Sequence, residues 1–275
     1  MPPGTLSRPL VPAFLARGSH GAVVAPHHLA TAAGLGILRA GGTAVDAAIA
    51  TNAVLAVVDN QACGLGGDAF WLIWDEAAGR QTGLNGSGRS ASRAQAADLR
   101  ARGLQTIPHR GGLSITVPGA VRSWGDAHDR FGRLPRADLL APAIELARDG
   151  FPADDAFCRS VEVSAAVFAR ELGPDSAGWS AVYRPADRPW QTGQRVRLPA
   201  LAKTLERIAA EGWAEPYEGE TARLQATALG AAGSAIGLDD LRSHASTWTE
   251  PISTEYRGVQ VTGHPPNSSG FVALE

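Results

Sequence analysis

The chain has 275 residues, of which 44% are hydrophobic and 19% are charged, and its formal net charge is −2 at pH 7. This composition is typical of a soluble globular protein with one large core or two smaller ones. Nucleic acids and anionic membranes require a concentrated basic face, so the near-neutral charge balance argues against both as partners. Cys63 and Cys158 have no zinc-ligand spacing, so the sequence predicts no metal site and favours free core thiols over a disulfide.

The N-terminal region contains one short apolar run, residues 10–16, which Pro12 interrupts. That run barely reaches the length of a signal-peptide core and has no clear cleavage site. No stretch approaches the ~20 apolar residues of a membrane span. We therefore expect a flexible arm over residues 1–20, a single domain over residues 21–275, and a cytoplasmic protein, with a periplasmic or secreted location as the alternative.

The first ordered elements are expected to be a strand at residues 21–25 and a helix at residues 28–39. Capping or a solvated surface position is the default role of His27 and His28 at their junction. Thr43 and Asp46 have the spacing of a capping box and predict the start of a helix that continues to Val58. This helix is almost entirely apolar, so we expect it to be buried and its Asn52 to require a hydrogen-bond partner.

A glycine-rich segment, residues 64–68, leads into a predicted β-hairpin with strands at residues 70–74 and 81–84. A second glycine-containing loop, residues 85–89, follows the hairpin. Further along the chain, the pattern predicts a helix capped by Ser92 and ending near 102, a strand at 114–117, helices at 119–131, 137–148, 198–209 and 221–231, and a strand pair at 249–256 and 259–262. The apolar run 271–275 is too short for an independent helix, so the chain reads as truncated.

The two glycine loops hold the candidate functional residues. The segment Gly64, Gly66, Gly67 lacks the phosphate-binding patterns and precedes a strand, so tight-turn geometry explains it better than a phosphate site. Asp68 is either a functional carboxylate or a turn cap. Arg89 stands among small residues, where a guanidinium binds a substrate carboxylate in bidentate fashion, although an ordinary surface arginine fits the spacing equally well.

Several motifs occur together, in the order typical of the γ-glutamyltransferase family, which the chain therefore resembles over residues 21–275. The motifs are Gly21-Ala-Val-Val-Ala25, Gly41-Gly-Thr-Ala-Val-Asp-Ala-Ala48, Gly64-Leu-Gly-Gly67, Val117-Pro-Gly119, Leu146-Ala-Arg-Asp-Gly-Phe151, Tyr256-Arg-Gly258 and Pro265-Pro-Asn-Ser-Ser-Gly270. The resemblance implies the large-subunit part of an α/β N-terminal nucleophile hydrolase, an αββα sandwich made as a self-cleaving precursor.

The resemblance also implies a reaction. A threonine at the start of the small subunit attacks a γ-glutamyl amide of the glutathione type, its own α-amino group acts as the base, and the acyl group passes to water or an amino acid. No cofactor or metal is needed. That threonine lies beyond this chain, so no catalytic residue is assigned here and the chain alone is expected to be inactive. Its partners are the small subunit and a small-molecule amide.

One segment departs from the family pattern. Typical members have an arginine in a D-F-R-E segment after the hairpin, whereas this chain has Leu84-Asn-Gly-Ser-Gly-Arg89, as in the branch that includes cephalosporin acylases. Arg89 and Ser87 are the predicted substrate-binding residues, and Gly64, Gly66, Gly67 and Asp68 the predicted pocket loop. Three alternatives remain: a related amide acylase, an inactive half that acts only in binding or assembly, and an unrelated nucleotide-binding domain.

Overall fold

A computed structural model describes residues 17–275 of the chain. The expected N-terminal arm therefore lies mostly outside the described residues. The helices are α1 His28–Arg39, α2 Ala44–Val58, α3 Ala96–Ala101, α4 Ala120–Phe131, α5 Arg136–Asp149, α6 Asp155–Glu171, α7 Ala177–Tyr183, α8 Pro199–Glu211, α9 Glu215–Glu218, α10 Glu220–Ala231 and α11 Leu238–Arg242. The strands are β1 Ala69–Asp75, β2 Arg80–Gly86, β3 Phe151–Pro152, β4 Arg195–Val196, β5 Thr247–Thr249, β6 Ile252–Tyr256 and β7 Val259–Gly263. Short 3₁₀ helices lie at Gly112–Ser114, Gly173–Ser176, Pro185–Asp187 and Ser269–Leu274.

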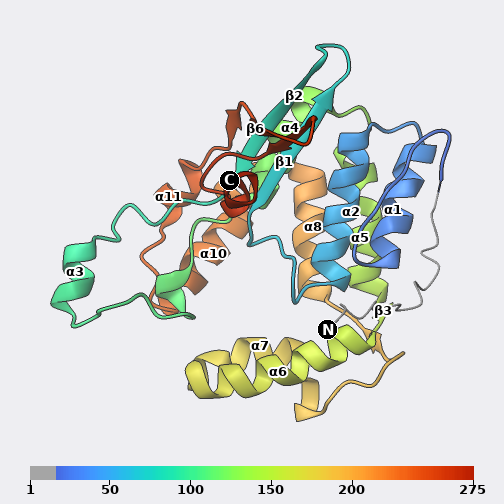
Figure 1. The fold of residues 1–275 in the computed structure, drawn as a ribbon. Helices are drawn as coiled ribbons and strands as arrows, with labels where there is room; N and C mark the ends of the chain where they lie inside the picture. The colour runs from blue at the N-terminus through green and yellow to red at the C-terminus, as the bar shows by residue number, and fades with distance from the viewer. Residues whose placement is uncertain (1–16) are drawn as a thin grey trace, which may run out of the picture.

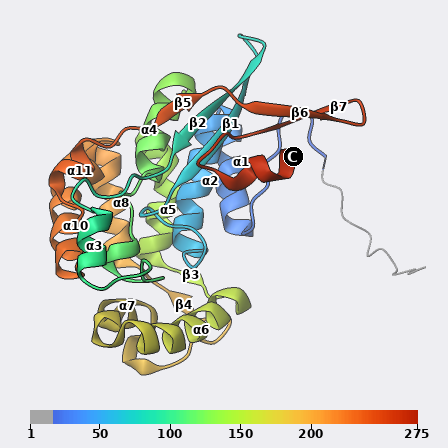
Figure 2. The same cartoon turned by 60° about the vertical axis from the view of Figure 1, so that its left-hand side comes forward.

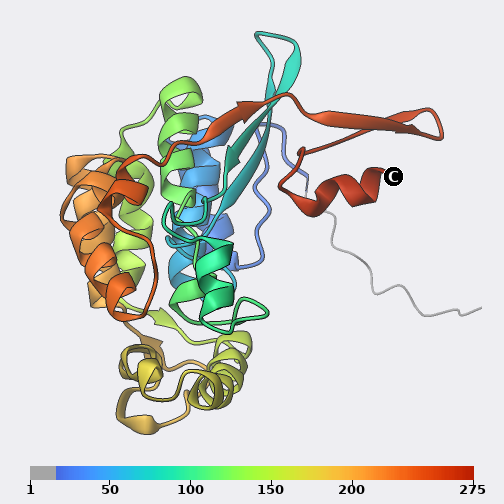
Figure 3. The same ribbon diagram turned by 90° about the vertical axis from the view of Figure 1, so that its left-hand side faces the viewer.

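A layer of helices forms the centre of the molecule. Helix α2 packs against α1, α4 and α5, and α5 packs against α8 (Figure 1). The sheet β1-β2-β5 is antiparallel and lies against α4 through β2. Helices α6 and α7 lie together at one end of this layer, and the β6–β7 hairpin extends away from it (Figures 2 and 3). The main core runs through the helical layer and continues under the sheet, where Leu84 is fully buried.

The predicted buried helix is confirmed as α2. Thr43 and Asp46 form the expected capping box, with the Thr43 N–H 2.9 Å from Asp46 Oδ2 and the Asp46 N–H 3.1 Å from Thr43 Oγ1. Asn52 has the partner that its burial requires, because the Trp124 indole N–H donates to its Oδ1 at 3.0 Å. His27 caps α1 by accepting a hydrogen bond from the Leu29 N–H, which is one of the two roles that its position in the sequence allowed.

Three strand predictions were wrong. Residues 21–25 form no strand, because no other strand within residues 17–275 pairs with them, and Val24 is 94% exposed. Residues 114–117 also form no strand, and their extended part makes one backbone hydrogen bond, from the Val117 N–H to the Arg89 carbonyl, before Pro118, which has no N–H to donate. The strand expected over 249–256 is broken at Pro251 into β5 and β6 for the same reason.

Two helix predictions need correction. Helix α3 is shorter than expected: its N-cap is Gln95, so Ser92 lies three residues before the cap, where its N–H donates to Asp240 Oδ1 at 2.8 Å. The longest helix, α6, was not predicted at all, although Asp154 caps it by accepting from the Phe157 N–H at 2.7 Å. The hairpin expected around Arg257-Gly258 is confirmed as β6–β7, and both turn residues have positive φ, as a tight two-residue turn requires.

Asp46 joins the helical layer to the loop between α4 and α5. Its carboxylate is fully buried and accepts hydrogen bonds from the backbone N–H groups of Thr43, Arg133 and Leu134. These donors have no other acceptor if the carboxylate is removed, and an unpaired buried donor costs about 1–3 kcal/mol.

We expect Asp46→Ala to lower the free energy of unfolding by about 2–4 kcal/mol, because it removes a helix cap and also leaves buried donors unpaired. Urea unfolding followed by circular dichroism would measure this change. The matched control is Asp138→Ala, which removes an exposed carboxylate from the first turn of α5. Equal effects of the two substitutions would contradict this role of Asp46.

Candidate active-site region

The two predicted loops meet at the start of α4. The Gly67 carbonyl accepts hydrogen bonds from the Gly119 and Ala120 N–H groups at 3.0 and 2.9 Å. The Gly88 N–H donates to Asp68 Oδ1 at 2.8 Å, and the Val117 N–H donates to the Arg89 carbonyl at 2.9 Å. Segments that are remote in the sequence are thus held together by backbone hydrogen bonds, and Asp68 acts here as the acceptor that fixes the second loop.

Glycine is required in the second loop rather than the first. A Cβ on Gly88 would lie 1.6 Å from the Val117 carbonyl oxygen, and a Cβ on Gly119 would lie 2.2 Å from that of Gly86. No heavy atom of the described chain lies within 4 Å of a Cβ placed on Gly66. The backbone therefore approaches closest at Gly86–Gly88, whereas Gly66 faces open space.

A side chain at Gly88 has to push two backbone segments apart, so we expect Gly88→Ala to lower the free energy of unfolding by about 1–3 kcal/mol. For Gly66→Ala, which meets no neighbour, we expect a change within about 0.5 kcal/mol. Urea unfolding of the two variants in parallel tests this difference. A Gly66→Ala variant as unstable as Gly88→Ala would disprove the steric explanation.

A cavity of about 250 Å³ lies beside the first loop. Leu65, Gly66, Pro118, Tyr217 and Thr221 line it, together with residues of α8 and Gln225. Gly66 therefore does line a cavity, but Ser87 and Arg89 are not among the lining residues. The structure separates this cavity from the Arg89 loop, although both adjoin the start of α4.

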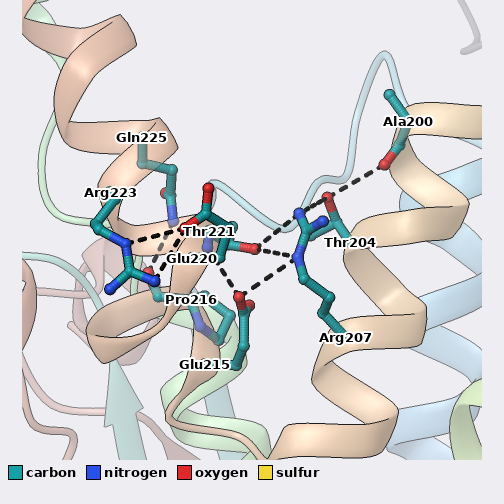
Figure 4. A network of polar contacts seen from close by, with 9 residues as sticks. All are labelled: Ala200, Thr204, Arg207, Glu215, Pro216, Glu220, Thr221, Arg223 and Gln225. Carbon is teal, nitrogen blue, oxygen red and sulfur yellow. Dashed lines mark hydrogen bonds and ion pairs between the residues drawn. The ribbon is translucent and has the colours of Figure 1, made fainter.

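A buried polar network joins α8, α9 and α10 next to this cavity (Figure 4). Glu215 Oε1 accepts from the Thr221 N–H at 2.8 Å and lies 3.5 Å from Arg207 Nε. Arg207 Nη2 also donates to Thr221 Oγ1 at 3.1 Å. Glu215 is 4% exposed, so the Arg207 guanidinium balances a charge that is removed from water. This network fixes the helices that form one wall of the cavity.

Arg89 is exposed, and its guanidinium makes no hydrogen bond or ion pair with any residue of the described range 17–275. Ser87 has partners. Its hydroxyl group lies 3.1 Å from Asn267 Oδ1 and 3.0 Å from Asn267 Nδ2. The structure thus places the predicted Arg89, Ser87 and Asp68 on one pair of loops. Their roles in binding stay predictions.

Sequence reasoning missed three side chains close to these loops. The Arg122 N–H donates to the Tyr217 hydroxyl oxygen at 2.8 Å, and the Arg122 guanidinium lies over the Tyr217 ring at 4.3 Å from its centroid. The ring of His244 stacks on that of Tyr217 at 5.7 Å. Arg122, Tyr217 and His244 are far apart in the sequence and follow no common pattern that predicts such a contact, so only the fold reveals it.

His244 is 5% exposed, and neither of its ring nitrogens has a hydrogen-bond partner in the described part of the chain. Burial lowers the pKa of His244, the positive charges of Arg122 and Arg89 lower it further, and Asp68 and Asp126 act in the opposite direction. The imidazole is therefore held neutral beside two guanidinium groups.

A histidine whose pKa is lowered by folding binds its proton more readily in the unfolded state. Its contribution to stability is therefore complete above the unfolded pKa of about 6.5. That contribution is lost as the pH falls through the pKa of the folded state. We expect His244→Asn to lose less unfolding free energy between pH 7 and pH 5 than the wild type. His109→Asn, at an exposed position, is the control. Burial also lowers the pKa of His27, and His27 is present in every variant, so its contribution cancels. Parallel pH profiles for His244→Asn and the wild type would refute the assignment.

The described residues include no group of three or more His, Cys, Asp or Glu side chains placed to hold a metal ion. Cys63 and Cys158 are both free and half-buried. Within residues 17–275, no helix has the length and apolar character needed to cross a bilayer. The cytoplasmic location stays a prediction.

Comparison with known proteins identifies the family. The gamma-glutamyltranspeptidase family model matches residues 30–275. The chain belongs to this family. It is 39% identical over 258 residues to the glutathione hydrolase-like YwrD proenzyme of Bacillus subtilis (strain 168), a match that covers 94% of this chain and 48% of that protein. It is 36% identical over 263 residues to the oxamate amidohydrolase proenzyme of Klebsiella pneumoniae, covering 93% and 48%.

The fold is also that of a known structure. The crystal structure of cephalosporin acylase from Bacillus halodurans matches with a TM-score of 0.85 and 36% identity, over 89% of this chain and 46% of that one. The predicted α/β N-terminal nucleophile hydrolase fold, present as its large-subunit part, is confirmed. The chain spans about half the length of the curated relatives that it matches.

Proposed function

We propose that this chain supplies the acyl-binding half of an enzyme that cleaves an amide bond and transfers the acyl group to water or to an amino acid. The observation that carries the proposal is the unpaired Arg89 guanidinium on a loop whose backbone is fixed by Asp68 and Val117. Its five N–H donors suit the carboxylate of an acyl group, which a guanidinium binds in bidentate fashion.

The attacking group is a threonine outside residues 1–275, supplied by the small subunit. Its α-amino group acts as the base and removes the hydroxyl proton, and backbone N–H groups stabilise the oxyanion of the tetrahedral intermediate. The residues of this chain hold the acyl end of the substrate, so that its carbonyl lies within reach of that hydroxyl. The reaction requires no metal or cofactor.

The exposed face of β1 supports a second subunit as partner. Trp71 and Ile73 pack toward the core, whereas Phe70, Leu72 and Trp74 point the other way and are 41%, 42% and 60% exposed. Apolar side chains that alternate in this way on an uncovered strand face indicate a surface that another element covers. The small subunit is the proposed occupant.

The acyl donor is proposed to be an amide whose acyl group ends in a carboxylate. The relatives include a glutathione hydrolase-like protein, an oxamate amidohydrolase and a cephalosporin acylase, whose names all refer to amide cleavage. This chain has Leu84-Asn-Gly-Ser-Gly-Arg89 in place of the D-F-R-E segment of typical family members, so its arginine is displaced by a couple of positions, and this departure favours an acylase over a glutathione hydrolase.

The test uses the self-processed full-length protein and two anilides, one of glutaric acid, which has a terminal carboxylate, and one of pentanoic acid, which has none. We expect Arg89→Ala to raise the KM for the glutaric anilide about 10- to 100-fold while self-processing continues, because a hydrogen-bonded charge pair contributes about 1.5–3 kcal/mol. Arg100→Ala, at an exposed position of α3, is the control.

An unchanged KM in Arg89→Ala would remove Arg89 from the site. A full-length protein that neither processes itself nor releases aniline would instead favour the rival function, that of an inactive binding or assembly module.

A further inference from the structure

Three polar side chains from remote parts of the chain form one hydrogen-bonded group at the start of the loop that carries Arg89. Asn85 lies in β2 and Ser87 just beyond it, and Asn267 lies in the loop that follows β7. The Asn85 side-chain amide donates to Asn267 Oδ1 at 2.8 Å, although these residues are 182 positions apart. The Ser87 N–H donates to Asn85 Oδ1 at 2.9 Å. The hydroxyl group of Ser87 contacts both amide atoms of Asn267.

The hydrogen bonds of this group leave donors unused. Asn267 Oδ1 accepts from Asn85 and from the Ser87 hydroxyl, so both of its lone pairs are engaged. The Ser87 oxygen in turn accepts from Asn267 Nδ2. Each amide nitrogen carries two N–H groups and uses one of them here. One N–H of Asn85 and one N–H of Asn267 therefore have no acceptor among the described residues. Both lie next to the loop that carries Arg89.

We propose that Asn85 and Asn267, the asparagine pair, bind the terminal carboxylate of the acyl donor together with Arg89, and that Ser87 positions the pair. The unused groups are all donors, and a carboxylate is an acceptor with about four lone-pair sites, so a guanidinium alone does not fill it. Asn267 is exposed and Asn85 half-buried, so both are accessible to a small molecule. This inference rests on the proposed function and names two further residues for the same site.

The alternative explanation is structural. The asparagine pair also connects the loop after β7 to the end of β2, and this connection alone would account for its hydrogen bonds. The two explanations differ in what they predict for substrates. A purely structural link affects every substrate equally, whereas a carboxylate-binding pair affects only substrates that carry the carboxylate.

The decisive variant is Asn267→Asp in the self-processed full-length protein. Aspartate keeps the shape of the side chain and the oxygen that accepts from Asn85 and Ser87, but it removes the N–H and adds a charge that repels a carboxylate. We expect the KM for the glutaric anilide to rise about 10- to 100-fold and the KM for the pentanoic anilide to change less than about twofold.

The matched control is Asn60→Asp. Asn60 also donates a side-chain hydrogen bond, to the Val57 carbonyl at 2.8 Å, and lies at the end of α2. We expect its KM values to equal those of the wild type. If Asn267→Asp does not mature, Asn85→Ser provides the same test, because it also removes an amide N–H, and we expect the same selective rise.

Equal changes in the two KM values, or no change in either, would overturn the assignment of the asparagine pair. The failure of the proposed function gives a different result, because the wild type would then cleave neither anilide, or Arg89→Ala would behave like the wild type. A result in which Arg89→Ala is impaired and Asn267→Asp is normal rejects only the present inference.

Discussion

The close backbone contact between residues 86–88 and residues 117–119 determines the geometry of the candidate site. Only glycine fits at Gly88 and Gly119, because a Cβ at either position would overlap a carbonyl oxygen. This contact sets the path of the second loop across the start of α4, and the Asp68 carboxylate holds the loop there. Arg89 follows directly on this fixed segment, and its own carbonyl accepts from the Val117 N–H, so the point at which its side chain leaves the backbone is fixed.

Rigidity in this region comes from two sources of different kinds. Under the sheet, close apolar packing around α2 and α4 stabilises the layer. Around it, buried polar groups such as Asp46 and Glu215 accept hydrogen bonds from specific backbone N–H groups and so define how neighbouring segments meet. The candidate site lies where these two kinds of contact adjoin.

The sequence predicted the elements whose signals are local. Helix α2 has a capping box and an apolar run, and the β1–β2 hairpin has an apolar run followed by a polar turn that ends in glycine, so both were predicted close to their observed bounds. Strand predictions at residues 21–25 and 114–117 failed because a strand requires a partner, and pairing is a property of the fold. Helix α6 was missed although Asp154 is an ordinary cap and its buried residues Phe157 and Val161 have helical spacing.

The candidate site divides in the same way. Arg89, Ser87 and Asp68 lie in short glycine-containing segments and were selected from the sequence as candidates, helped by the family motifs; their roles stay predictions. Asn267, His244 and Tyr217 reach the same region from later segments, and no spacing rule connects them to the first loop. The family motif at residues 265–270 marks a segment of the chain, but it does not predict which of its side chains contacts the candidate site.

The contact between Asn267 and the end of β2 has a consequence for evolution. Position 267 lies in an exposed turn, outside the hydrophobic core, yet its side chain touches both residues that flank Gly86. A replacement there alters the polarity of the neighbouring surface without disturbing the packed interior. If the asparagine pair binds substrate as proposed, this position allows substrate preference to change while the scaffold stays intact, and related proteins with different substrates are expected to diverge there.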